Sequence, residues 1–157
     1  MSNQVPAWQG PILDNHFHLN RNGRYLDAAH DFKRAGGTNI VLIHCPDFAS
    51  PPTTKEGHRA AYQNTIAMAE SVRTELDLHV RVVLGPHPAA FAHQFIEWVE
   101  EEGASGKNRA IENYRDSIDE AVKFYHEGKA HAIGEVGRPH WEVSQEIWDL
   151  SNDLLCE

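Results

Sequence analysis

The sequence predicts an α/β protein built on a parallel sheet, and three observations carry this prediction. Short apolar runs that suit strands alternate four times with longer segments whose apolar residues recur at helical spacing. Each apolar run ends in a polar or glycine-containing motif, which is where the chemistry of parallel sheets gathers. The composition, with 41% hydrophobic and 24% charged residues, is that of a globular protein. We therefore expect one domain spanning residues 1–157, with about four strand–helix units.

The first unit consists of a strand over residues 11–17 and a short helix over residues 25–35. The strand is predicted from an apolar run that ends in a histidine-rich motif. Gly36 and Gly37 follow the helical segment and provide a natural stop.

The second unit begins with a strand over residues 39–44, a continuous apolar run typical of burial on both faces. A proline-rich loop over residues 46–52 follows. Thr53, with Glu56 three residues later, resembles a capping box that opens a long helix ending near Leu76.

The third and fourth units extend the pattern. A strand over residues 79–84 precedes a helix that stops near Gly103, and a second helix is expected over residues 107–127. The last strand covers residues 130–133, and Ser144 caps a final helix. We interpret the apolar stripe of the 107–127 helix as core packing; it comprises Ile111, Tyr114, Ile118, Ala121, Val122 and Tyr125.

Composition excludes several classes of protein. The net charge of −9 argues against a broad nucleic-acid or acidic-membrane surface, although a bound cation would still allow a local phosphodiester site. Cys45 and Cys156 are far apart and form no metal-type pair, which fits a reducing cytoplasm. Residues 1–10 show no signal peptide, and no apolar run reaches membrane-spanning length. We expect a cytoplasmic protein.

Polar side chains follow each predicted strand. Asp14, His16 and His18 alternate at the end of the first strand, so they point to one face, and imidazole suits zinc and similar divalent metals. The same pattern fits a half-exposed strand whose histidines bind nothing. His44, His87 and Glu135 end the next three strands, which favours the metal-site interpretation.

Three motifs, in this order, resemble those of the TatD-like metal-dependent hydrolases. These are DNHFHL at residues 14–19, GPHP at residues 85–88 and AIGEVG at residues 132–137. The family belongs to the amidohydrolase superfamily and has a (β/α)8 barrel, so the resemblance implies a TIM-barrel-like fold. The archaeal branch is the nearer match, because Arg138 and Pro139 replace the Leu-Asp that usually follows the last motif.

The resemblance implies a role for each motif. His16 and His18 would bind one divalent ion, and Glu135 would be the catalytic carboxylate that bridges two ions. The metals would be Zn, Mg or Mn, and the reaction would be hydrolysis of DNA 3′ ends or small phosphodiesters by a metal-activated water. His87 and Arg138 would contact the substrate; a turn histidine and a surface salt bridge are the respective alternatives.

Other polar residues carry weaker expectations. Asp14 is expected to orient a ligating histidine or cap the strand. Four histidines on predicted helices are expected at the surface: His30, His58, His93 and His126. His44 and Asp47 could line the pocket, but the resemblance gives them no role.

The resemblance covers only the first half of the family's barrel, since a complete barrel takes about 250 residues. Two later histidine positions and a final aspartate of the family have no counterpart here. We therefore expect a fragment, a truncated gene product or one half of an assembly, with little hydrolysis by itself. Its open sheet edge would be covered by a missing C-terminal half or by another copy. Two alternatives remain: a phosphoesterase of the polymerase-and-histidinol-phosphatase type, and a non-catalytic assembly module. A lysine-carbamate amidohydrolase is disfavoured because the fourth strand ends in Glu135.

Overall fold

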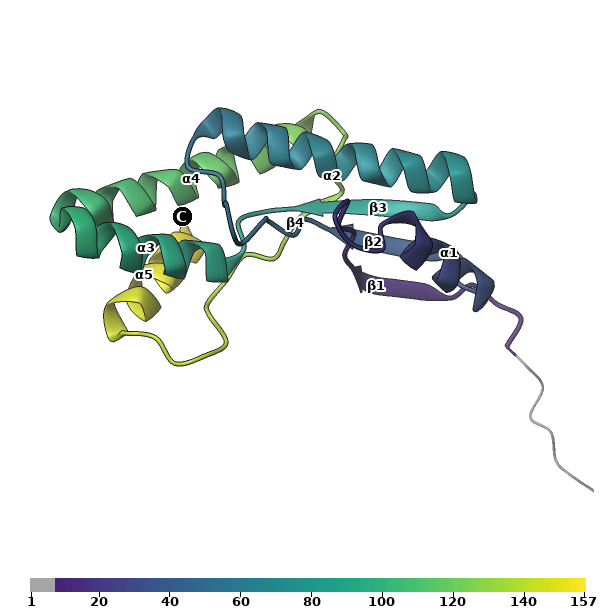
Figure 1. Ribbon diagram of the computed structural model, residues 1–157, viewed down its shortest axis with the longest axis horizontal. Coiled ribbons are helices and arrows are strands. Elements are labelled where there is room, and N and C mark those ends of the chain that lie inside the picture. Colours follow the sequence, from purple (N-terminus) through teal and green to yellow (C-terminus); the bar gives the residue numbers. More distant parts are fainter. Residues whose placement is uncertain (1–7) are drawn as a thin grey trace, which may run out of the picture.

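The structure is a computed structural model that describes residues 8–157 (Figure 1). Four strands form one parallel sheet in the order β1-β2-β3-β4: β1 (Leu13–Phe17), β2 (Asn39–Ile43), β3 (His79–Leu84) and β4 (Ala132–Ile133). Residues 8–157 also form five helices, of which the third and fourth follow one another without a strand between them: α1 (Leu26–Arg34), α2 (Lys55–Leu76), α3 (Pro88–Glu102), α4 (Ala104–His126) and α5 (Gln145–Cys156). The predicted α/β class is confirmed, and the arrangement is that of a partial TIM barrel.

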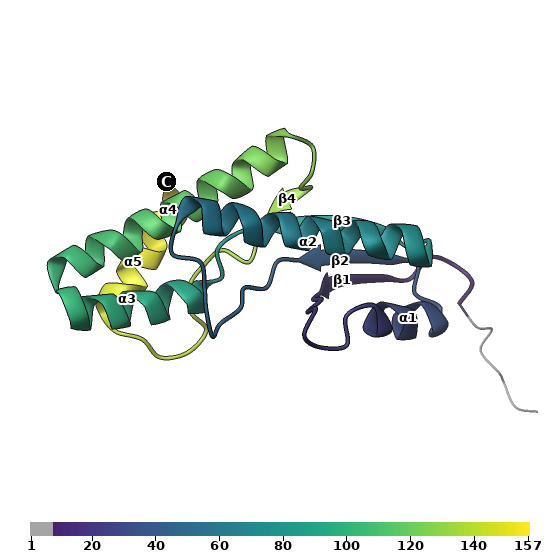
Figure 2. The ribbon, with the colours of Figure 1, turned by 45° about the horizontal axis from the view of Figure 1, so that its top comes forward.

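One face of the sheet packs against helices. Ile40 and Leu42 of β2 and Val82 of β3 are almost completely buried in a core that they share with Ala69 and Val72 of α2. Figures 1 and 2 show α2 lying along β3, in agreement with the contacts between these two elements. Alternate positions on a strand point to opposite faces, so this face forms the apolar layer of the sheet.

The opposite face of the sheet is more open. Asn39 and Val41 of β2 are half-buried, and His79 and Arg81 of β3 are exposed. The prediction that the second strand is buried on both faces therefore holds only in part: on this second face Ile43 is buried, whereas Asn39 and Val41 are half-buried.

A second core joins α3, α4 and α5. It contains Phe91 and Phe95 of α3, Tyr114 of α4, and Ile147 and Leu154 of α5, all buried. In Figures 1 and 2 these three helices lie at the end of the molecule opposite α1. Part of the apolar stripe predicted for residues 107–127, namely Ile111, Tyr114 and Ile118, thus packs in this second core, whereas Ala121 lies in the core of the sheet.

Helix boundaries follow from local hydrogen bonds. The side chain of Thr54, and not Thr53, caps α2 by accepting the N–H of Gly57 at 3.1 Å, so the predicted cap was wrong by one residue. Ser144 caps α5 as predicted, accepting the N–H of Ile147. Gly103 has φ +62° and joins α3 directly to α4, which is why α4 begins three residues earlier than predicted.

Three further details differ from the predictions. Tyr125 is 49% exposed and is not a core residue. His58 is buried and is therefore not a surface histidine; its Nε2–H donates to Oδ1 of Asn113 at 3.0 Å. The fourth strand begins at Ala132, since the N–H of Ala130 still donates to the carbonyl of Phe124 at the end of α4.

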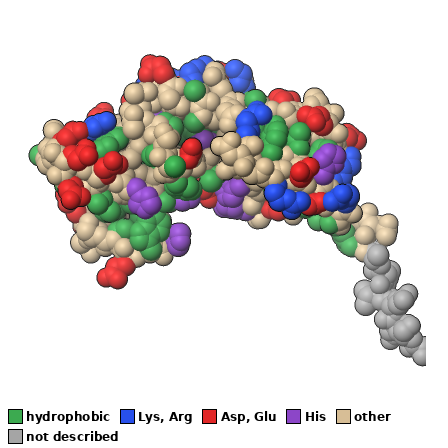
Figure 3. All heavy atoms as spheres, viewed as in Figure 1, with side chains coloured by type: hydrophobic (Ala, Val, Ile, Leu, Met, Phe, Trp, Pro, Cys, Tyr) green, Lys and Arg blue, Asp and Glu red, His purple; other side chains and the backbone are tan. Residues whose placement is uncertain are grey.

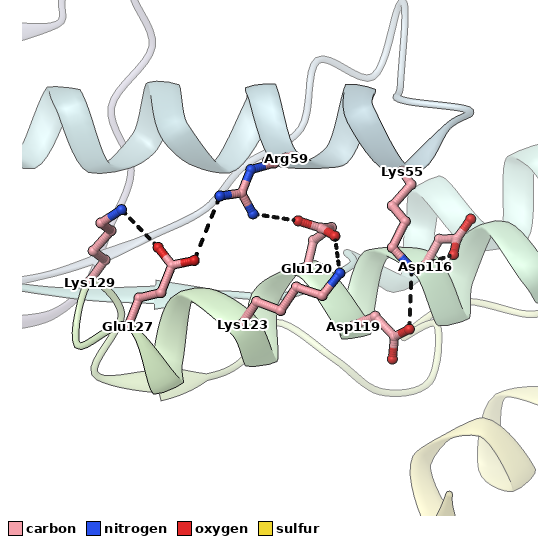
Figure 4. A network of polar contacts seen from close by, with 8 residues as sticks. All are labelled: Lys55, Arg59, Asp116, Asp119, Glu120, Lys123, Glu127 and Lys129. Atoms are coloured by element: carbon pink, nitrogen blue, oxygen red, sulfur yellow. Dashed lines mark hydrogen bonds and ion pairs between the residues drawn. The ribbon is translucent and has the colours of Figure 1, made fainter.

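Charged side chains also hold α2 against α4 (Figure 4). Glu120 of α4, whose side chain is only 4% exposed, accepts from Arg59 of α2 at 2.9 Å and from Lys123 at 2.6 Å. Burial raises the pKa of Glu120, but Lys123 and Arg59 outweigh it and keep the pKa below its usual value. The carboxylate is therefore charged and paired.

The surface carries both signs of charge. Figure 3 shows acidic and basic side chains interspersed on one face, together with several histidines. Among residues 8–157, no helix is both long and apolar enough to cross a membrane. The expectation that residues 1–10 lack a signal peptide falls mostly on residues outside the described range.

Candidate metal centre

Three side chains predicted to bind metal meet at the C-terminal ends of the strands. His16 lies on β1, His18 follows β1, and Glu135 follows β4; one donor atom from each lies within 4.8 Å of the other two. Because β1 and β4 are the two outer strands, these side chains approach each other across the ends of β2 and β3. The predicted grouping of these three residues is thus present in the fold.

A bulge in β1 sets the direction of His16. The pairing with β2 shifts between Asp14 and Phe17, so three steps along β1 match two steps along β2. Asp14 Oδ1 accepts the backbone N–H of His16 at 2.9 Å, within this irregular stretch. Asp14 therefore braces the backbone that presents His16, in line with the strand-capping role considered from the sequence.

Hydrogen bonding leaves one nitrogen of His18 available. Its Nδ1 lies 3.1 Å from the carbonyl oxygen of Ile43, at the end of β2. A carbonyl can only accept, so Nδ1 carries the proton and Nε2 retains its lone pair. The ring also meets His16 edge-on, with centroids 4.8 Å apart. The backbone of β2 thus holds His18 in the tautomer that a ligand needs.

Glu135 presents its two carboxylate oxygens to different imidazoles. Oε1 lies 3.1 Å from Nε2 of His16, and Oε2 lies 3.3 Å from Nε2 of His87. The side chain is only 13% exposed. Glu135 also adopts a left-handed backbone conformation, φ +61°, which is strained for a residue with a Cβ. This strain at the centre of the cluster is typical of a functional position.

Glycine brings the ends of β3 and β4 close together. A Cβ on Gly85 would lie 2.3 Å from the carbonyl oxygen of Gly134, so the backbones approach too closely for a side chain. This contact explains why residue 85 is a glycine, and it brings the motif that contains His87 next to the one that contains Glu135.

His87 has the opposite tautomer to His18. Its Nδ1 accepts the N–H of Ala89 at 3.0 Å as the cap of α3, so the proton of the neutral ring sits on Nε2, facing Glu135. Burial lowers the pKa of His87, and His18, His140 and His16 add to that effect while Glu135 opposes it. A neutral ring with an N–H directed into the site is a hydrogen-bond donor, as expected for a residue that contacts substrate.

The other candidate residues are distributed differently. Arg138, expected to contact substrate, lies over the ring of Trp148 in α5, 4.4 Å from its centroid. Burial and Glu135 raise the pKa of the Cys45 thiol, so it is a poor source of a thiolate ligand. The structure therefore brings together His16, His18, His87 and Glu135, whereas Arg138 is held against α5.

Phe48 is a residue at the site that the sequence reasoning missed. Its ring meets His87 edge-on with centroids 5.0 Å apart, and it is 45% exposed. The loop that carries it is anchored nearby, because the side-chain amides of Gln94 and Asn113 both donate to the carbonyl of Pro52 at 3.0 and 3.1 Å. The signal available in the sequence was an aromatic residue in a proline-rich loop directly after a buried strand.

Comparison with known proteins places this arrangement in a family. A sequence model of the family described as "TatD related DNase" matches residues 13–157. The chain is 28% identical over 150 residues to "Uncharacterized protein MJ1127" of the archaeon Methanocaldococcus jannaschii, a match that covers 92% of this chain and 48% of the relative. The chain thus spans about half the length of this curated relative, and no solved structure matches it. The chain belongs to the TatD related DNase family, which at family level consists of metal-dependent hydrolases.

Proposed function

We propose that this chain supplies the first part of a two-metal phosphodiesterase site that acts on DNA 3′ ends. One observation carries the proposal: the two oxygens of Glu135 face two different imidazoles, those of His16 and His87. A carboxylate oriented in this way has one oxygen for an ion bound by His16 and His18, and another for the opposite side of the site.

The donor set fits a divalent ion. Two imidazole nitrogens and one carboxylate oxygen suit zinc, and also manganese. They lie within 4.8 Å of one another, so small side-chain rotations bring all three onto one ion. His16 and His18 would hold this ion, and Glu135 would share it with a second. When bound, such ions polarise a phosphoryl oxygen and lower the pKa of water.

The protein's own groups would orient the substrate. The Nε2–H of His87 points into the site and would donate to a non-bridging phosphate oxygen, in place of its contact with Glu135. Ile43 keeps His18 in its ligating tautomer, and Asp14 braces His16. We keep Arg138 as a substrate contact that must first leave the ring of Trp148.

The proposal is tested by metal binding and hydrolysis together. A single-stranded oligonucleotide labelled at its 5′ end is incubated with the chain and Mn²⁺, and its shortening from the 3′ end is followed by electrophoresis. We expect slow shortening that disappears in the double variant His16→Ala/His18→Ala and persists in His126→Ala, an exposed histidine on α4. Hydrolysis that the double variant retains in full would rule out this site.

A non-catalytic assembly module is the second candidate, and the outer edge of β1 favours it. Among residues 8–157, β1 pairs with β2 and with no other strand, and Leu13 and Ile12 at this edge are 57% and 38% exposed. Under this proposal, a second copy or a further segment covers the edge. Native mass spectrometry at neutral pH tests the first option: a dimer supports it, whereas a monomer at micromolar concentration contradicts it.

A further inference from the structure

A cavity of about 420 Å³ lies beside the metal cluster, between the segment after β1 and the loop after β2. His18, which belongs to the cluster, lines it, as do Arg21, Asp47 and Asn64. Its volume falls within the range of pockets that bind small organic ligands. The cavity therefore leads directly from a candidate metal ligand to an arginine that the sequence reasoning left without a role.

Arg21 is oriented but not neutralised. Its Nε donates to Oδ1 of Asn64 at 2.6 Å, and its guanidinium lies over the ring of Tyr25, 5.0 Å from the centroid. Within residues 8–157, no carboxylate lies within ion-pair distance of Arg21, in contrast to Arg24, which pairs with Asp31. The side chain is exposed, so its two terminal amino groups can reach a ligand. A guanidinium held in this way loses little conformational freedom when it binds an anion.

The charged groups that line the cavity favour a nucleotide, which has a phosphate at one end and uncharged groups at the other. A guanidinium fork matches the oxygens of a phosphate, whereas Asp47 elsewhere in the lining repels one. Asp47 is fixed by the N–H of Ala49, which donates to its Oδ1 at 3.0 Å. A phosphate would thus lie at the Arg21 end, with the uncharged sugar and base toward Asp47.

We infer that this cavity binds the nucleotide adjacent to the one whose phosphodiester meets the metal centre, with Arg21 holding its phosphate. This inference rests on the proposed function, because the cavity adjoins the cluster through His18. It assigns Arg21 as a specificity-determining residue for chains longer than a single nucleotide.

The test compares thymidine 5′-monophosphate with the thymidine trinucleotide TpTpT, both titrated calorimetrically in the presence of Ca²⁺. In Arg21→Gln we expect about tenfold weaker binding of the trinucleotide and less than a twofold change for the monophosphate. The slope of log affinity against log salt for the trinucleotide should fall by about 0.7, the value for one single-strand phosphate contact. Arg21→Lys should recover part of the loss, because it restores the charge without the fork.

Arg24→Gln is the matched control, since Arg24 lies on the same segment but is paired with Asp31; it should behave as the wild type. Trinucleotide binding and salt slope that remain unchanged in Arg21→Gln would overturn the inference alone. Mn²⁺ binding, followed by electron paramagnetic resonance, distinguishes a failure of this inference from a failure of the proposed function. A wild-type chain that binds no Mn²⁺ overturns the proposed function and this inference with it.

Discussion

Two pairs of histidines in this chain have opposite environments. His16 and His18 are exposed at the strand ends, and His18 uses Nδ1 on the backbone carbonyl of Ile43, which leaves the lone pair of Nε2 free. His44 and His58 are buried, and each is hydrogen-bonded to a neighbouring side chain, Thr65 at 2.8 Å and Asn113 at 3.0 Å. Proximity to the site is therefore not enough for a histidine to be a candidate ligand; it also needs a ring nitrogen that no neighbouring side chain occupies.

The largest effect is expected from the buried pair: the free energy of unfolding should fall in acid. Burial, with smaller contributions from His58, His18 and His87, lowers the pKa of His44 to about 4 from 6.5. Between pH 6.5 and 4, His44 therefore binds a proton in the unfolded chain but not in the folded chain. The free energy of unfolding should fall by roughly 3 kcal/mol over this interval. His44→Asn should flatten the pH dependence of urea unfolding, whereas the exposed His126→Asn should leave it unchanged. An equally steep dependence in His44→Asn would contradict the assignment.

For the exposed pair, we expect that removing the neighbouring carboxylate weakens metal binding and leaves the fold intact. Glu135→Gln removes the carboxylate that faces His16, and Mn²⁺ affinity should fall at least about 100-fold. Glu142→Gln, an exposed carboxylate a few residues later, is the control. Calorimetric titration measures the affinity, and circular dichroism checks the fold. If Glu135→Gln binds Mn²⁺ as tightly as Glu142→Gln, the cluster is not a metal site.

Asn113 sharpens the comparison, because it is hydrogen-bonded to the buried His58 and to none of His16, His18 and Glu135. Its side-chain N–H groups donate to the carbonyl oxygen of Pro52 and to Oε1 of Gln94, and its Oδ1 accepts from Nε2–H of His58 at 3.0 Å. Asn113→Ala removes the hydrogen-bond partner of His58 Nε2 and Gln94 Oε1, both on buried side chains, which should lower the free energy of unfolding by about 2 kcal/mol. Mn²⁺ affinity should change less than threefold. A variant that loses metal affinity as Glu135→Gln does would show that the two networks are not separate.

The smallest effect is expected in the ionic contact between α2 and α4. Glu120→Gln weakens the contacts to Arg59 and Lys123, both partly exposed, and should cost about 1 kcal/mol of stability. Glu112→Gln, an exposed partner of Arg115, provides the control and should be nearly neutral. Thermal unfolding at low and high salt measures both variants; a Glu120→Gln protein as stable as Glu112→Gln would show that this contact contributes little.

Much of the fold could be predicted because it depends on local patterns. The limits of β3 and the cap of α5 were predicted correctly, since apolar spacing and a capping serine act within a few residues. The errors arose where contacts between distant parts of the chain determine whether a side chain is buried. His58 was predicted to be exposed, but Asn113, 55 positions later in the chain, buries it. Tyr125 shares the spacing of core residues, but it lies where nothing covers it.

By itself, the sequence determined the parallel α/β order, the family and the residue types at the strand ends, because these are encoded in short motifs and their succession. Only the tertiary structure decided which of those residues meet. It brings Glu135 to His16 across two intervening strands, assigns opposite tautomers to His18 and His87, and turns Arg138 onto Trp148. The physical reason is that hydrogen-bond partners and side-chain directions at a site depend on close approaches such as that of Gly85 to Gly134, and no local pattern contains that information.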